Sequence, residues 1–253
     1  MLKIFRTFIL VTCMSIPAQA MAETITISAP EWCPYICPNE PAKPGLLVEY
    51  TQAIFQRAGY DITVDVYPWS RAIRYAEDGT RHALLGAAKH EAPSLIFPEN
   101  EIGEQTFCFY TKADDEWTYS SPAAVIGKDI IYPQDALPEE IIPYKNRARF
   151  SEVTGSVTYI EQALGMLLSD RTEIVLSSYY WMTHFLESHD MQEKVKLSGC
   201  AASTKVYLAF SPADGKLEET KKYIKIFDRE IEILKQEGFF ESLLIKYNLT
   251  PRK

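Results

Sequence analysis

The sequence has few positive charges for its length, and no segment in which they cluster. Its 253 residues hold 26 Lys and Arg against 34 Asp and Glu, a formal net charge of −8 at pH 7. An acidic chain without a basic patch is a poor ligand for nucleic acid or an anionic membrane surface, so neither is predicted as a partner. Internal repeats and low-complexity tracts are absent, and 47% hydrophobic residues exclude disorder.

Long hydrophobic runs are also scarce. The run Thr7–Ile16 is far shorter than the ~20 residues that a membrane-spanning helix needs, and no run of that length follows it. Lys3 and Arg6 precede the run, and small residues follow it up to Ala20 and Ala22. This arrangement is typical of a secretory signal peptide cleaved after one of these two alanines.

We therefore expect residues 1–22 to be removed, which leaves an exported chain of 231 residues with a net charge of −10. Cys13 is a weak lipoprotein signal, because Thr12 before it fits a lipobox poorly. We expect the mature chain to be a free, soluble monomer. It is long enough to form one large domain or two lobes.

Cysteines are few, and four remain after cleavage. An even number in an exported chain indicates disulfides, with three possible connectivities. Cys33 and Cys37 lie four residues apart in a Pro-rich loop, so a local bridge is the natural pairing, and it leaves Cys108 with Cys200. A zinc or redox interpretation of the first pair is weak, because the spacing is C-x3-C and no His or second Cys pair lies nearby. We predict neither a metal site nor a cofactor.

Catalytic motifs are missing as well. The sequence contains no G-x-S-x-G, no H-E-x-x-H and no phosphate-binding P-loop. His184, Glu187 and His189 share a segment, but their spacings do not place all three on one helical face. His90 and Glu91 are neighbours, but neighbours in a chain need not converge on one site. We therefore predict no catalytic residue and no enzyme.

The hydrophobic pattern alternates between strand and helix periods over two halves of the chain. Strand–helix–strand–helix–strand order implies parallel pairing with helical crossovers, and hence an α/β fold. A strand Lys205–Phe210 and a long amphipathic helix from Gly215 follow the second half. One doubly wound sheet and two lobes joined by two crossing strands both fit this pattern. The predicted strands are Thr24–Ala29, Ile62–Val66, His82–Ala88, Gln105–Lys112, Asp129–Tyr132, Ala148–Val153, Glu173–Leu176 and Lys194–Leu197.

Several short motifs follow one another in a characteristic order along the mature chain. They are the aromatic loop Trp32, Pro34 and Tyr35, then Gly45 with Glu49, Pro68–Trp69, Gly79 and the terminal GFFESLLIKYNL. In this order they resemble bacterial extracellular solute-binding proteins of family 3, the amino-acid-type receptors of ABC importers. The resemblance implies a two-lobed type 2 periplasmic-binding fold, with a mostly parallel sheet flanked by helices in each lobe and two crossing strands as the hinge.

Under this resemblance, residues 23–113 with 205–253 form lobe 1, and residues 114–204 form lobe 2. A small polar ligand would bind between the lobes, stabilise their closure, and be presented to an ABC permease or a membrane sensor. The same scaffold also hosts periplasmic enzymes of dehydratase or lyase type, which is the alternative function. A third interpretation, favoured if side chains plug the cleft, is an interaction module that needs no ligand.

The family's ionic contacts to an amino acid are altered in this sequence. Family members hold the ligand carboxylate with an Arg after the third strand, where this chain has Lys89 in the segment Ala87–Pro93. His82 replaces an Asp of the first lobe, and Ser178 stands where an Asp contacts the ligand's ammonium group. An ordinary zwitterionic amino acid is therefore disfavoured as the ligand.

The candidate ligand-binding residues come from both predicted lobes. In the first lobe they are Trp32, Tyr35, Trp69, Arg71 and Lys89, and in the second they are Ser156, Tyr159 and Ser178. Aromatic faces suit planar, sugar-like or cationic ligands, and the helix start at Ser156 offers free N–H groups to an anion. Structural roles compete with these assignments: Trp69 as a core residue, Arg71 as a solvated side chain, and Ser156 as a helix N-cap.

Overall fold

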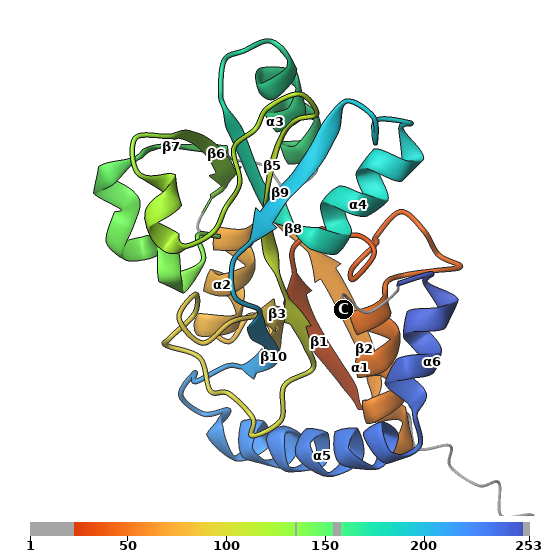
Figure 1. Cartoon of the computed structure of the whole chain (residues 1–253). Coiled ribbons are helices and arrows are strands. Elements are labelled where there is room, and N and C mark those ends of the chain that lie inside the picture. Colours follow the sequence, from red (N-terminus) through yellow and green to blue (C-terminus); the bar gives the residue numbers. More distant parts are fainter. Residues whose placement is uncertain (1–22, 135, 154–157, 250–253) are drawn as a thin grey trace, which may run out of the picture.

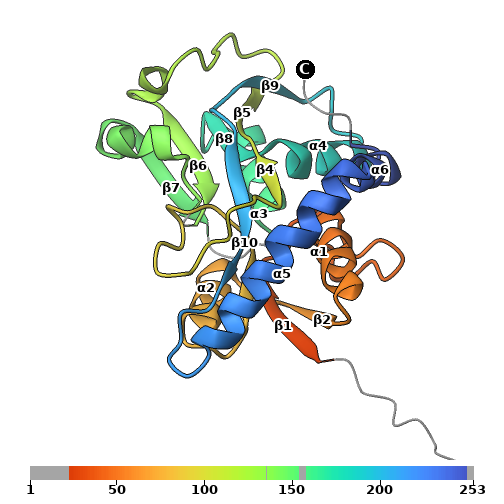
Figure 2. The same cartoon turned by 90° about the horizontal axis from the view of Figure 1, so that it is seen from below.

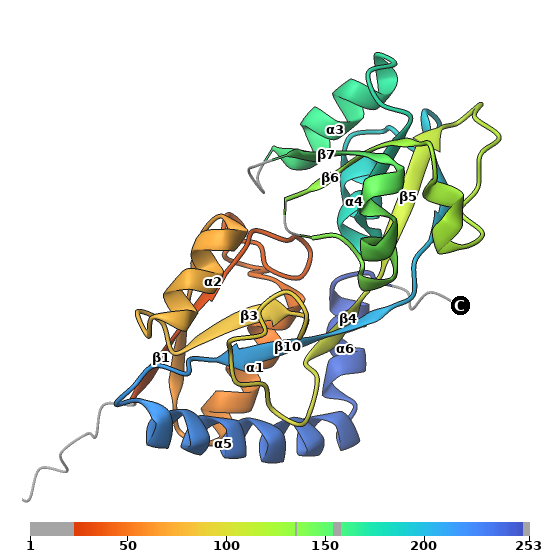
Figure 3. The same cartoon turned by 90° about the vertical axis from the view of Figure 1, so that its left-hand side faces the viewer.

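The chain folds into two lobes, each built around a five-stranded sheet (Figures 1 and 3). The structure is a computed structural model that describes residues 23–134, 136–153 and 158–249. The predicted signal peptide therefore lies outside the described residues. Within the described part of the chain, no helix is long and apolar enough to cross a membrane.

The sheet of lobe 1 has the strand order β2-β1-β3-β10-β4. Strand β1 pairs in parallel with β2 and β3, while β10 runs antiparallel to β3 and β4. The strand bounds are β1 Thr24–Ala29, β2 Asp61–Val66, β3 Ala83–Ala87, β4 Gly103–Gln105 and β10 Thr204–Phe210. The helices of this lobe are α1 Leu46–Arg57, α2 Trp69–Glu77, α5 Leu217–Gln236 and α6 Phe239–Lys246.

Lobe 2 repeats this plan with the strand order β7-β6-β8-β5-β9. Here β6 is parallel to β7 and β8, and β5 is antiparallel to β8 and β9. The strands are β5 Phe107–Lys112, β6 Asp129–Pro133, β7 Arg149–Val153, β8 Ile174–Ser178 and β9 Val195–Cys200. The helices are α3 Tyr159–Leu168 and α4 Tyr179–Ser188, with 3-10 segments at Pro122–Val125 and Glu139–Arg147. The predicted two-lobed α/β fold is confirmed.

Two strands cross between the lobes, and the first crosses earlier than the sequence predicts. Only Thr106 separates β4 from β5, so residues 107–112 belong to lobe 2 and the predicted boundary at residue 113 is wrong. The apolar pattern runs on through the crossing, because the chain remains a strand while it changes sheets. The second crossing lies between Cys200 and Thr204, and a 2.7 Å contact between the hydroxyl oxygens of Thr106 and Ser203 joins the two.

The long helix α5 packs across lobe 1 (Figure 2). Its apolar face presents Tyr223, Phe227, Ile231 and Leu234 to the lobe 1 core. Such burial of an amphipathic face returns the C-terminal part of the chain to the first lobe. Both predicted disulfides form. Cys33–Cys37 closes the loop after β1, and Cys108–Cys200 joins β5 to β9 beside the hinge.

Candidate functional site

A cavity of about 80 Å³ lies between the lobes and is lined from both. Its walls are formed where parallel strands end, which is the edge of an α/β sheet at which ligands gather. From lobe 1 come Trp32 after β1, Trp69 at the start of α2, Glu91 after β3, and Gln105 of β4. From lobe 2 come Phe107 of β5, Gln134 after β6, Ser178 at the end of β8, and Trp181 of α4.

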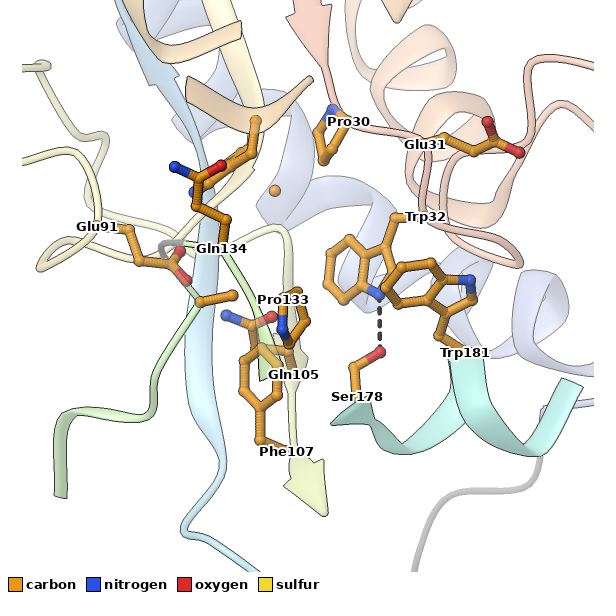
Figure 4. A pocket seen from close by; sticks show the side chains of 13 residues that line it. Pro30, Glu31, Trp32, Glu91, Gln105, Phe107, Pro133, Gln134, Ser178 and Trp181 are labelled. Atoms are coloured by element: carbon orange, nitrogen blue, oxygen red, sulfur yellow. Dashed lines mark hydrogen bonds between the residues drawn. The ribbon is translucent and has the colours of Figure 1, made fainter. Parts of the chain in front are cut away.

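Trp32 reaches across the cavity and contacts lobe 2 directly. Its Nε1–H donates to Ser178 Oγ at 2.8 Å, and both side chains are buried (Figure 4). The ring fits because Gly86 of β3, at φ +90°, has no side chain: a Cβ there would lie 3.2 Å from the indole. The indole N–H of lobe 1 therefore supplies the donor for the hydroxyl of lobe 2.

Aromatic packing continues this contact between the lobes. The ring of Tyr35 lies 4.2 Å from that of Trp32 and 5.9 Å from that of Tyr180 on α4, centroid to centroid. Trp181 packs against the hydrophobic clusters of both lobes. These contacts hold the lobes together on one side of the cavity through side chains of the protein itself.

Glu91 is the acidic side chain directed into the cavity, beside the amides of Gln105 and Gln134 (Figure 4). Burial raises the pKa of its carboxyl group to about 7, although hydrogen bonds from the Ala88 N–H and from Gln105 act in the opposite direction. The Ala88 N–H donates to Glu91 Oε2 at 2.8 Å and fixes the side chain. Burial also raises the pKa of Glu31, but the carboxylate of Glu31 points away from the other lining side chains (Figure 4).

Three of the predicted ligand-binding residues line the cavity: Trp32, Trp69 and Ser178. Trp69 thus lies at the cavity wall, and α2 begins with it. Its indole Nε1 is buried and has no hydrogen-bond partner among the described residues. The predicted residue Ser156 lies outside the described residues.

Two predicted tyrosines lie in hydrophobic cores and do not line the cavity. Tyr35 is 4% exposed and packs beneath Trp32, with its hydroxyl donating to the Glu104 carbonyl at 3.3 Å. Tyr159 is fully buried in lobe 2, and its hydroxyl donates to the carbonyl of Leu176 at 2.6 Å. Tyr159 is thus a core residue of lobe 2, because its hydroxyl finds a backbone acceptor there. The Tyr35 ring lies between the lobes against Tyr180, but outside this cavity.

The two predicted basic residues also point elsewhere. Arg71 is exposed on α2 and is absent from the cavity wall. Lys89 is exposed, with its Nζ 4.9 Å from the centroid of the Tyr207 ring. Neither residue lines the cavity in this structure. Position at the end of a strand or the start of a helix brings a residue near the cleft without aiming it there.

Most of the lining residues were missed by sequence reasoning, among them Glu91, Gln105, Phe107, Gln134 and Trp181. The position of Glu91 two residues after Lys89, past the carboxyl end of β3, was a usable signal. Gln105 and Phe107 flank the hinge residue Thr106, so their role depends on the crossing. Trp181 sits in an apolar helix, and nothing in that pattern separates it from a core residue.

The sequence matches no family model and no curated protein. Solved structures match it along most of its length. An ancestral arginine-binding protein bound to arginine superposes with a TM-score of 0.71 at 15% identity, covering 90% of this chain and 99% of that one. A histidine kinase sensor domain with similarity to periplasmic binding proteins superposes with a TM-score of 0.71 at 16% identity. The match covers 90% of this chain and 96% of that one.

A third structure is the substrate-binding protein of an ABC uptake transporter from Streptococcus pneumoniae with bound histidine. It superposes with a TM-score of 0.70 at 15% identity and covers 88% of this chain and 92% of that one. Identities this low establish the fold and leave the ligand of this chain open. The chain has the two-lobed fold of periplasmic binding proteins.

Proposed function

We propose that the chain is a periplasmic solute-binding protein, which closes its two lobes on a small ligand and presents it to a membrane partner. The observation that carries the proposal is the cavity between the lobes, with Glu91 and Trp69 on one side and Phe107 and Trp181 on the other. A ligand that touches both walls stabilises the closed state by its differential affinity for it. Cavities at interfaces between lobes are the usual place for such ligands.

The partner belongs to one of two classes. One of the structures compared above serves an ABC uptake transporter, and another is the sensor domain of a histidine kinase. We propose an ABC permease or a membrane sensor as the partner, and co-purification of the ligand-loaded chain from solubilised membranes separates the two.

A thermal-shift screen tests the binding function. Purified protein of residues 23–253 is incubated with amino acids, polyamines, sugars and organic acids. A ligand at 100 times its Kd stabilises the folded state by about 2.7 kcal/mol, which for a protein of this size raises Tm by about 5–10 °C. We expect such a shift with one chemical class, and a smaller radius of gyration in X-ray scattering when the ligand is added.

Two variants locate the binding site. Trp69→Ala removes a wall of the cavity and is expected to abolish the shift. Arg71→Ala removes an exposed side chain of the same helix and is expected to preserve it. Absence of any shift across the screen, together with an unchanged radius of gyration, would contradict a binding function. It would favour a module in which the Trp32–Ser178 contact keeps the cleft closed without a ligand.

A second candidate is an enzyme of dehydratase or lyase type on this scaffold. Glu91 favours it, because a buried carboxyl group with a pKa of about 7 is poised to exchange protons near neutral pH. However, Lys89 does not converge with Glu91 in the cavity, and the walls around it are mainly aromatic and amide side chains. Consumption of a ligand found in the screen, abolished by Glu91→Gln, would establish the enzymatic alternative.

A further inference from the structure

Among the described residues, the charged side chains of the cavity wall are all acidic. Glu91 points into the cavity, and no Lys, Arg or His lines it among the described residues. Lys89, the nearest cation in sequence, is exposed and lies over the Tyr207 ring. A ligand carboxylate entering this space would meet Glu91 and lose its hydration without gaining a counter-charge, which is strongly unfavourable.

The aromatic walls favour the opposite sign. Trp32, Trp69, Trp181 and Phe107 line the same cavity as Glu91. The face of an indole carries negative charge density and attracts an ammonium group, by about 2 kcal/mol or more when water is excluded. The rings and the carboxylate therefore act in the same direction on a positively charged ligand.

The other polar side chains beside Glu91 are uncharged. The amides of Gln105 and Gln134 line the same cavity and add hydrogen-bond donors and acceptors. An amide oxygen can accept a hydrogen bond from an N–H of the ligand without bringing a second charge into the cavity.

We propose that the ligand is a small organic cation, an amine or quaternary ammonium compound without a carboxylate. Its positive group is bound by Glu91 and the tryptophan faces. The inference rests on the proposed binding function and names its ligand class. The small cavity favours a compact ligand, and a larger one would need the lobes to open further.

Matched pairs of compounds test the ligand class by calorimetry on the protein of residues 23–253. Choline and 3,3-dimethylbutan-1-ol have the same shape and differ only in the positive charge. Histamine and L-histidine differ only in the carboxylate. We expect choline to bind at least tenfold more tightly than its neutral counterpart, and histamine at least tenfold more tightly than histidine.

Two variants test the assigned contacts. Glu91→Gln keeps an acceptor for the Ala88 N–H, so the loop is expected to fold, but it removes the charge and is expected to weaken choline binding at least tenfold. Glu104→Gln is the matched control, because Glu104 neighbours Gln105 on β4, is exposed, and is absent from the cavity wall. We expect it to change choline affinity less than twofold.

The outcomes separate this inference from the function on which it rests. Tighter binding of histidine than of histamine, or equal binding of choline and its neutral counterpart, overturns the cationic ligand class while binding itself stands. Binding of sugars or organic acids alone also overturns the cationic ligand class and leaves the binding function in place. A protein that responds to no compound of any class, and stays folded in every assay, overturns the binding function as well.

Discussion

Replacement of Glu91 by glutamine should stabilise the protein at alkaline pH and leave its stability unchanged in acid. Glu91→Gln mimics the protonated carboxyl group and retains an acceptor for the Ala88 N–H, which donates to Oε2 at 2.8 Å. Burial is the main cause of the raised pKa, with no charged side chain among its causes. The variant therefore removes an ionisation and little else.

The size of the effect follows from the pKa. In the unfolded chain the carboxyl group has its usual value of 4.5, and in the folded protein its pKa is about 7. Each pH unit between these values corresponds to about 1.4 kcal/mol, so the ionised folded form is disfavoured by about 3 kcal/mol. Because the folded pKa is raised, the parent protein has its full stability below pH 4.5, loses stability as the pH rises from 4.5 through 7, and lacks about 3 kcal/mol above that range. At pH 8 the variant should exceed the parent by about 3 kcal/mol.

Scanning calorimetry at pH 4, 6 and 8 measures the difference between variant and parent. For a protein of this size, 3 kcal/mol corresponds to a Tm difference of about 6–12 °C at pH 8, falling to about zero at pH 4. Glu104→Gln, which alters an exposed carboxylate of β4, should show no such trend. A difference for Glu91→Gln that is the same at pH 4 and pH 8 would refute the reasoning, since it would mean that Glu91 is not desolvated.

Three further outcomes are expected. Trp32→Phe removes the donor to Ser178, a hydrogen bond worth about 1 kcal/mol, and should enlarge the radius of gyration of the unliganded protein. Adding Ser178→Ala to this variant should not enlarge the radius further, because the bond is already lost. An unchanged radius would contradict a role of this bond in holding the lobes together. Cys108→Ser with Cys200→Ser opens a loop of 92 residues and should lower stability in urea by about 2–4 kcal/mol; an unchanged midpoint would show that the bond is dispensable. Tyr159→Phe should lower the free energy of unfolding by about 1 kcal/mol, because a backbone carbonyl loses its donor, and should change choline affinity less than twofold. A tenfold loss of affinity would show that the hydroxyl contacts the ligand.

Much of the fold follows from local pattern. Alternation alone predicts β1 at its full extent, Thr24–Ala29, and places β2 within one residue of Asp61–Val66. The segment Glu139–Arg147 is less predictable. Pro143 is unfavourable inside a regular helix, yet the segment forms a 3-10 helix in which Ile141 is buried. Patterns of two or 3.6 residues report local burial, so they identify strands and helices well and irregular segments poorly.

The candidate site is predictable only in part. Trp32, Trp69 and Ser178 line the cavity as the sequence suggests, because each sits at the carboxyl end of a strand or at the helix start beyond it. Tyr159 and Lys89 occupy comparable positions and face elsewhere. Rotamer and local packing decide between these outcomes, and neither is encoded in spacing along the chain.

The sequence by itself determined the alternation of strands and helices, favoured the disulfide pairs that the structure contains, and showed that no Arg lies in the segment after β3. These properties depend on residue type and on short-range order. Tertiary structure alone decided that Trp32 meets Ser178, 146 residues away, and that Glu91 rather than Lys89 enters the cavity. The physical reason is that burial and side-chain direction arise when two lobes close on each other, and a raised carboxyl pKa exists only inside that enclosure.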